Sequence, residues 1–280
     1  MDRRRSLATA IERHFGAFRK SQRKTLLALC WGLVVARRLG LASIARGMLS
    51  TTTVRHRIKR VDRFASNGGI RVKEVTPALA SWLLWATRGT LLVALDWTDI
   101  GCKRVMLLGA VAVGSRAIPL AWTVMGQSQF NRKRKSRNDA EEELILRLKE
   151  ALGEVSWVLV ADRGFARADL FRKLQRWEIR FVIRASGSPW VQMDGWAGRL
   201  WNVPRKADCT QCWEHVLYHK TMRVSMSLVV THREPAPEPW YLVTNLDRAS
   251  QAVKVYERRV WIAEHFPAFV AVGYYGGVGP

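Results

Sequence analysis

Two aspartates each stand directly after a short apolar run. Residues 90–95 lead into Asp96, and residues 156–161 lead into Asp162. Continuous apolar runs of this length are typical of buried central strands. Because ligand groups of α/β sheets gather at the carboxyl ends of neighbouring strands, strand pairing could bring Asp96 and Asp162 within a few ångströms of each other. A lone aspartate at a strand end can also simply cap the following turn.

A pair of carboxylates, with a glutamate on a helix further along the chain, indicates a site for divalent metal ions. Mg²⁺ and Mn²⁺ are hard cations that prefer carboxylate oxygens. Two such ions about 4 Å apart can activate an attacking oxygen and stabilise a leaving one. The chemistry that this arrangement serves is phosphodiester hydrolysis and transfer.

The charge of the chain points to a polyanionic partner. The 280 residues carry 46 Lys and Arg against 23 Asp and Glu, and 48% of them are hydrophobic, enough for a sizeable core. Lys and Arg in this excess favour nucleic acid or an anionic membrane. A membrane anchor is not expected, because the apolar run from Leu26 to Ala36 is about half of a bilayer span. The four cysteines form no disulfide framework, which favours a cytoplasmic, nucleoid-associated protein that binds DNA.

Residues 1–87 are predicted to form a helical DNA-binding domain of three to five helices, since their apolar spacing is helical. The segment from Val54 to Phe64 places five basic residues between apolar ones, among them Arg60 and Arg63. A basic amphipathic helix is often only a solvated face. The charge of the whole chain favours a surface that contacts phosphates.

Residues 88–280 change to a mixed pattern of strands and helices, which predicts an α/β (α+β mixed) domain. A strand-rich insertion is expected at about 186–238, before a helix at 250–266. The other expected elements are strands at 104–113, 118–125, 180–185 and 239–245, helices at 139–152 and 167–177, and a basic loop at 130–137 that includes Arg134.

Four stretches of the chain resemble one family. They are Leu95–Asp99 (LDWTD), Ala161–Phe165 (ADRGF), Tyr241–Asn245 (YLVTN) and Tyr256–Ile262 (YERRVWI). Together they resemble the DDE transposases of the insertion sequence 4 type, the cut-and-paste group with a ribonuclease-H-like core. The resemblance covers nearly the whole chain.

The resemblance implies a DNA transposase that hydrolyses phosphodiester bonds and transfers strands at the ends of an insertion element. Asp96 and Asp162 would be the first two carboxylates of its metal-binding triad, holding two Mg²⁺ or Mn²⁺ ions. DNA would be the partner, at element ends and at target sites, with a homodimer in the synaptic complex.

The third carboxylate departs from the family pattern. Ala263 occupies the position of the expected glutamate, and Glu264 follows it. One position on a helix is a rotation of about 100°, so Glu264 would point elsewhere than Ala263. Either a local shift of the helix makes Glu264 the third catalytic and metal-binding residue, or the triad is broken. The residues after it also depart from the family, which favours a degenerate or truncated copy.

The family pattern also implies DNA contacts. Tyr256 and Arg259 would contact phosphate near the reactive end. Apart from the family pattern, the basic loop that includes Arg134 is expected to be solvated without DNA and to contact the backbone of bound DNA. Trp240 matches a position where an indole stacks on a displaced base, although a tryptophan before a buried strand is equally well explained as core.

Other functions stay open. A catalytically dead transposase could act only as a DNA-binding or inhibitory protein, and a related metal-dependent nuclease of repair or recombination would hydrolyse DNA without transferring strands. Cys209, Cys212, His215 and His219 invite a zinc interpretation, but their spacing is too short for a zinc finger, which favours coincidence.

Overall fold

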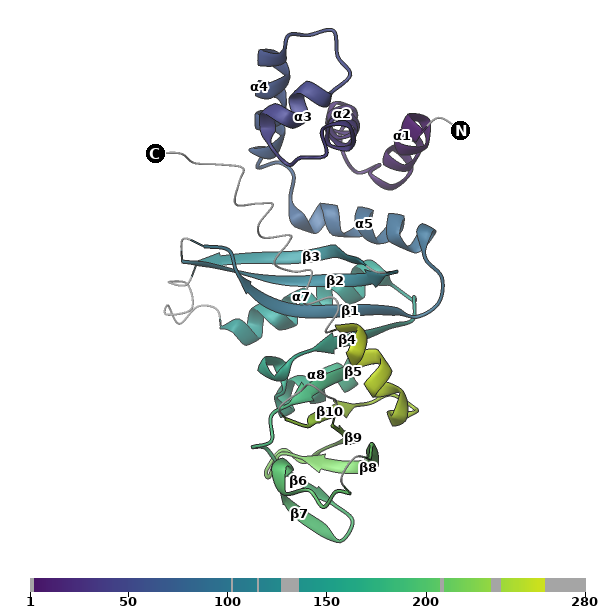
Figure 1. Cartoon of the computed structure of the whole chain (residues 1–280), viewed down its shortest axis with the longest axis vertical. Helices are drawn as coiled ribbons and strands as arrows, with labels where there is room; N and C mark the ends of the chain where they lie inside the picture. Colours follow the sequence, from purple (N-terminus) through teal and green to yellow (C-terminus); the bar gives the residue numbers. More distant parts are fainter. Residues whose placement is uncertain are drawn as a thin grey trace. The chain divides into compact units, whose positions relative to one another are not determined.

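The computed structural model describes residues 3–101, 103–114, 116–126, 136–206, 209–232 and 238–259 (Figure 1). These residues fall into two compact units. One consists of residues 3–87 with Glu150–Leu152, and the other of residues 88–149 and 153–259. The division after Thr87 lies where the sequence changes from a helical to a strand-like pattern. Each unit is described by itself.

The first unit is built from five helices in its described part, which confirms the predicted helical pattern. Their apolar faces form two clusters, one around Phe15 and Phe18 and the other around Ala45 and Val61. No single helix in the described part of the chain is long and apolar enough to cross a membrane, although α2 and α3 together, bent by 97°, reach the length and hydropathy of a broken span. The helices are α1 (Arg3–His14), α2 (Lys20–Ala36), α3 (Leu41–Gly47), α4 (Val54–Ala65) and α5 (Val72–Ala86).

Helices α2 and α3 cross at a pair of glycines. A Cβ added to Gly47 would collide with the carbonyl oxygen of Gly32, and one added to Gly32 would collide with the carbonyl oxygen of Ile44. Both obstacles are backbone atoms, which cannot rotate away as the end of a side chain can. The close approach of the two helices therefore depends on the absence of side chains at these two positions.

The second unit contains one ten-stranded sheet in the order β3-β2-β1-β4-β5-β10-β9-β8-β6-β7. Strand β4 runs parallel to β1 and to β5, and the other pairs of neighbours are antiparallel. The strands are β1 (Leu91–Asp99), β2 (Arg104–Val113), β3 (Arg116–Gly126), β4 (Trp157–Ala161), β5 (Arg180–Ala185), β6 (Trp190–Met193), β7 (Trp196–Arg199), β8 (Gln211–Tyr218), β9 (Val224–Thr231) and β10 (Trp240–Thr244).

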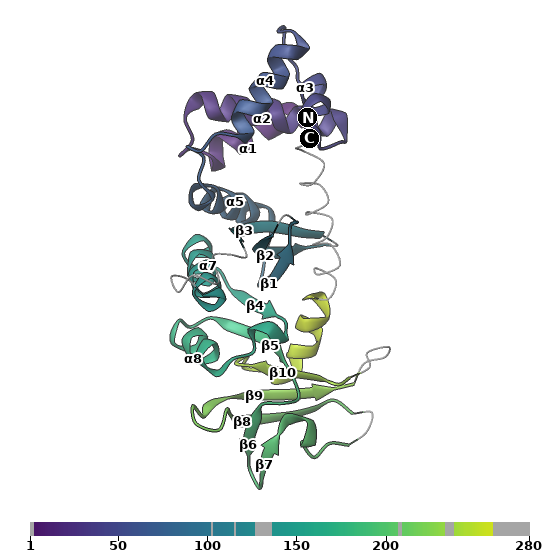
Figure 2. The ribbon, with the colours of Figure 1, turned by 90° about the vertical axis from the view of Figure 1, so that its left-hand side faces the viewer.

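Helices cover both faces of this sheet. Figure 2 shows α7 (Arg137–Leu152) and α8 (Ala168–Arg176) against one face and the helix of residues 252–259, in yellow, against the other. The α7 side is packed closely, since a Cβ on Gly109 of β2 would come within 2.9 Å of Leu148. On the opposite face, Val253 and Tyr256 pack with apolar residues from β1, β4, β5, β9 and β10.

Two of the predicted strands, 104–113 and 180–185, match β2 and β5 residue for residue. The region around 186–238 contains β6 to β9, and these strands extend the same sheet beyond β10. The predicted helix at 250–266 begins with a short 3₁₀ turn, η3 (Ala249–Gln251), and continues as α-helix through residue 259. Its remaining residues lie outside the described part.

Substituting Gly47→Ala in the full-length chain is expected to lower the free energy of unfolding of the helical unit by at least about 2 kcal/mol, because the added methyl group meets backbone. Thermal unfolding followed by far-ultraviolet circular dichroism measures this. Gly16→Ala is the control, since a Cβ at Gly16 meets no atom within 4 Å. Equal stability of the two variants would show that the helices do not approach closely.

Candidate active site

Asp96 and Asp162 lie side by side on one face of the sheet. In the parallel pair of β1 and β4, Leu95 stands opposite Ala161, so the aspartates occupy the next position on neighbouring strands. Leu92 and Val160 lie an even number of positions before the aspartates and therefore share their face of the sheet. Both point into the core beneath the helix of residues 252–259. The expectation that strand pairing brings the two carboxylates together is therefore met, but the expectation that the first strand ends at Asp96 is wrong, because β1 continues to Asp99 in its pairing with β2.

Each carboxylate is fixed by a backbone N–H of the residue that follows it. The N–H of Trp97 donates to Oδ1 of Asp96 at 3.0 Å, and the N–H of Arg163 donates to Oδ1 of Asp162 at 2.6 Å. Asp162 also caps a 3₁₀ turn, η1 (Arg163–Phe165). The side chains are 27% and 37% exposed, respectively. Capping a turn and facing a site are thus compatible roles for Asp162.

Arg259 joins the two carboxylates from the helix above them. Its Nη2 lies 3.5 Å from Oδ1 of Asp96 and 3.8 Å from Oδ2 of Asp162. These two oxygens are therefore no further apart than the sum of those distances. The guanidinium is 9% exposed, and its Nε is buried without a hydrogen-bond partner among the described residues. One largely buried protein cation thus faces both acids and offsets part of their negative charge.

The residues just before this helix anchor it to the sheet. In Asn245, the side-chain oxygen accepts the N–H of Phe181 at 2.8 Å, and the side-chain nitrogen donates to the carbonyl of Ile179 at 3.0 Å. The hydroxyl of Thr244 donates to the carbonyl of Phe181 at 2.6 Å. These bonds fasten the end of β10 to β5 and so set where the helix bearing Arg259 begins.

Burial controls the protonation of Asp96. Loss of solvent raises the pKa of this carboxyl above its ordinary value, and the negative charge of Asp162 adds to the effect. The positive charge of Arg259 and the N–H of Trp97 act in the opposite direction without cancelling it. A second cation at the site would favour the ionised form of Asp96 and would be bound by it.

Tyr256 and Trp240 lie together in the core beside Arg259. The ring of Tyr256 is 1% exposed, and burial raises the pKa of its hydroxyl. The two rings meet edge to face, with centroids 5.1 Å apart, and the Arg259 guanidinium lies 6.0 Å from the Tyr256 ring centre. Trp240 is half-buried against the same cluster. This arrangement accounts for both side chains as packing, and their DNA contacts stay predictions.

Two of the remaining predicted residues, Arg60 and Arg63, lie on α4 of the helical unit. Arg60 donates two hydrogen bonds to the hydroxyl of Thr25, at 3.0 and 3.2 Å, and so links α4 to α2. Arg63 is exposed, and its Nε donates to the carbonyl of Lys59. Arg134 and Glu264 lie outside the described residues, as does Ala263.

The described residues hold no group of three or more His, Cys, Asp and Glu side chains placed to bind a metal ion. Cys209 and Cys212 are exposed. Asp96 and Asp162 nevertheless offer what a hard divalent cation uses, namely two converging carboxylates with solvent access for further oxygen ligands. The pair fits such an ion as a partial site that needs a third ligand from elsewhere.

Glu141 is a polar core residue that the sequence analysis missed. It lies on α7, is 3% exposed, and accepts the indole N–H of Trp97 at 2.8 Å. Its other carboxylate oxygen pairs with Arg167. In the sequence it is one of several acids near the start of a helix, where acids are common for electrostatic reasons. The only hint was Trp97, because a buried indole N–H requires an acceptor.

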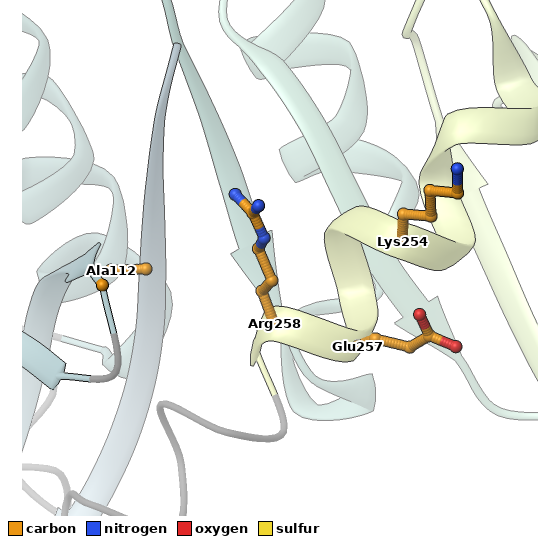
Figure 3. Close-up of a pocket in the computed structure, with 5 residues that line it drawn as sticks. Ala112, Lys254, Glu257 and Arg258 are labelled. Carbon is orange, nitrogen blue, oxygen red and sulfur yellow. The ribbon is translucent and has the colours of Figure 1, made fainter. Parts of the chain in front are cut away.

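An open pocket of about 650 Å³ lies beside the helix of residues 252–259. It is lined by Ala112 of β2 and Gly114 of the following turn, and by Lys254, Glu257 and Arg258 (Figure 3). The side chains of Lys254 and Arg258 are exposed. The pocket thus presents two cations on the helix that carries Arg259.

No family model matches the sequence, and no curated protein does. Among solved structures, the chain is similar to the cryo-EM structure of the piggyBac transposase synaptic complex with hairpin DNA, with 12% sequence identity and a TM-score of 0.45. The match covers 95% of this chain and 66% of that one, so this chain spans slightly less than two thirds of the neighbour's length. A likeness this distant carries no argument about activity, which must come from the site itself.

Asp96→Asn is expected to raise the free energy of unfolding of the metal-free protein at neutral pH by about 1 kcal/mol. The reason is that the raised pKa of Asp96 makes its ionisation costlier in the folded than in the unfolded chain. The gain should vanish below about pH 4, where the carboxyl is protonated in both states. Urea unfolding in chelator across this pH range measures it.

The control for this experiment is Asp194→Asn in the exposed turn between β6 and β7. A lower stability of Asp96→Asn than of wild type at neutral pH would mean that the attraction of Arg259 outweighs the cost of burial.

Proposed function

We propose that the protein is a DNA transposase that uses divalent metal ions to hydrolyse phosphodiester bonds at element ends and to transfer the freed strand. The observation that carries the proposal is the convergence of Asp96 and Asp162 directly after Leu95 and Ala161, the last residue pair between two parallel neighbouring strands. Strand order β3-β2-β1-β4-β5, with β1 to β3 antiparallel and helices on both faces, supports a ribonuclease-H-like core of the insertion sequence 4 type.

In this proposal Asp96 and Asp162 hold two Mg²⁺ or Mn²⁺ ions, and Glu264 is the expected third ligand. When bound, the ions supply the positive charge that activates water and stabilises the leaving oxygen. The chain's own residues orient this chemistry. Asp96 and Asp162 are held by backbone N–H groups, and Arg259 places a fixed positive charge where phosphate charge has to be neutralised.

DNA is the proposed partner, as the net charge of +23 indicates. The pocket beside the helix of residues 252–259 offers Lys254 and Arg258 to the phosphates of a DNA strand. In the helical unit, exposed Arg63 on α4 is available for the same kind of contact.

One observation favours a second candidate function. Arg259 already pairs with both carboxylates, and the described residues supply no third acid beside them. If Arg259 stays paired with both carboxylates and no metal ion binds there, the chain would bind element ends without cutting them. Such a protein would act as a DNA-binding inhibitor of transposition.

Cleavage of element-end DNA separates the two functions. With Mg²⁺ or Mn²⁺ the wild-type chain is expected to nick end DNA and to join the freed 3′ end to target DNA. Asp162→Ala should lower the nicking rate by more than about 100-fold, since it removes a metal ligand rather than a supporting residue. Asp194→Ala removes one negative charge from an exposed turn and is the matched control.

Tight binding of end DNA by the wild-type protein without any nicking would establish the inhibitor function instead. Nicking without strand transfer would indicate a nuclease.

Replacing Lys254 and Arg258 together by alanine is expected to weaken DNA binding across sequences. The dependence of log affinity on log salt should become shallower by about 2, roughly one for each phosphate contact that is lost. Fluorescence anisotropy over a salt series measures both effects. Glu257→Gln, in the same pocket, is the control and should not weaken binding, because it removes a negative charge.

A further inference from the structure

Glu141 is the polar residue that is hardest to explain by packing alone. Its side chain is 4% exposed, and it meets partners from two different segments of the chain. Oε1 accepts the indole N–H of Trp97 at 2.8 Å, and Oε2 pairs with the guanidinium of Arg167. A buried carboxylate is costly to desolvate, and here two donors at opposite ends of the group compensate for that cost.

The first partner belongs to the segment that carries Asp96. Trp97 is the next residue on β1, so its side chain points to the α7 face while Asp96 points to the face of Arg259. The N–H of Trp97 also donates to the Asp96 carboxylate. The contact of the indole with α7 therefore fixes the position of the backbone N–H that donates to Asp96. It also fixes the direction of the Asp96 side chain, which points to the opposite face of the sheet.

The second partner belongs to the segment that carries Asp162. This aspartate caps the turn η1, and its carbonyl accepts the N–H of Phe165 at 2.9 Å. The N–H of Arg167 in turn donates to the carbonyl of Phe165 at 2.9 Å. Fixing the Arg167 side chain thus fixes the turn that Asp162 begins. Arg167 has a second acidic neighbour, Glu142, at 3.6 Å.

We propose that Glu141 is a positioning residue for the aspartate pair. From the opposite face of the sheet, its single carboxylate links the segment after Asp96 to the segment after Asp162 and so sets the spacing between the two acids. The inference rests on the proposed function of that pair. Two metal ions tolerate little variation in the separation of their ligands, so a device that fixes this separation serves catalysis directly.

Apolar residues in place of a whole buried ion pair often stabilise a core as well as the pair does, whereas an apolar side chain at position 141 alone would leave the Trp97 indole N–H and Arg167 without this acceptor. The directional contacts are therefore the property that distinguishes Glu141. The decisive variant is Glu141→Gln, which keeps the size and one acceptor oxygen but removes the charge that faces Arg167. Trp97→Phe removes the indole N–H together with part of the ring, and keeps an aromatic side chain against the same apolar neighbours. Glu143→Gln is the control, because Glu143 lies on the same helix and is exposed and paired with Arg147.

Three measurements are made on each full-length variant. They are Mn²⁺ affinity of the protein by calorimetry, hydrogen exchange of the peptides that contain residues 96–99 and 162–167, and the kcat and KM for nicking of end DNA. Glu141→Gln should weaken Mn²⁺ binding and lower kcat by about 10-fold or more, with KM for DNA nearly unchanged. Exchange should accelerate in both peptides, although neither contains Glu141.

Trp97→Phe should accelerate exchange mainly in the first peptide, and Glu143→Gln should match wild type. Wild-type Mn²⁺ affinity and exchange in Glu141→Gln would overturn the proposal and leave the aspartate pair intact as a site. If Glu141→Gln does not fold, Trp97→Phe decides, and unchanged exchange and metal affinity in that variant would overturn it. If wild type neither binds Mn²⁺ nor nicks DNA, the proposed function fails, and hydrogen exchange still decides whether Glu141 couples the two segments.

Discussion

The parallel pairing of β1 with β4 places Leu95 opposite Ala161, and the rest of the site depends on this register. A shift by one residue would turn one aspartate to the opposite face of the sheet, where α7 packs. Parallel neighbours cannot be joined by a tight turn, so the chain must cross over between them, and α7 lies in that connection. The helix in this crossover therefore also supplies Glu141, on the face of the sheet opposite the two aspartates.

Two carboxylates on adjacent strands and on the same face repel each other unless a cation lies between them. Arg259 is that cation in the protein alone, and burial still keeps the pKa of Asp96 raised. The electrostatic balance is thus incomplete, because the single positive charge of Arg259 does not fully offset the desolvation of Asp96 and its repulsion from Asp162. Further positive charge would improve this balance, and the proposal of a metal-dependent enzyme rather than a purely structural ion pair rests on that property.

The sequence predicted the features that arise from local patterns. Strands 104–113 and 180–185 were found because continuous apolar residues stop at glycine or polar residues, and the aspartate pair was found because two such runs end in Asp. The partners of Arg259 and Glu141 could not be predicted, since both depend on contacts between segments far apart in sequence. The place of β10 between β5 and β9 was hidden for the same reason. Glu264 lies outside the described residues and stays a prediction.

The two faces of the sheet hold the aspartates in different ways. Arg259 acts by charge, and its position depends on Asn245 and Thr244, which fasten β10 to β5 before the helix begins. Glu141 acts by geometry, through one partner on each of the two segments. Because β4 lies between β1 and β5 and pairs with both, a displacement of either neighbouring strand would shift β4 and so move Asp162. The positive charge beside the aspartates and the spacing between them therefore depend on side chains on opposite faces of the sheet. A mutation of one of these side chains can change the charge while the spacing is kept, or the spacing while the charge is kept.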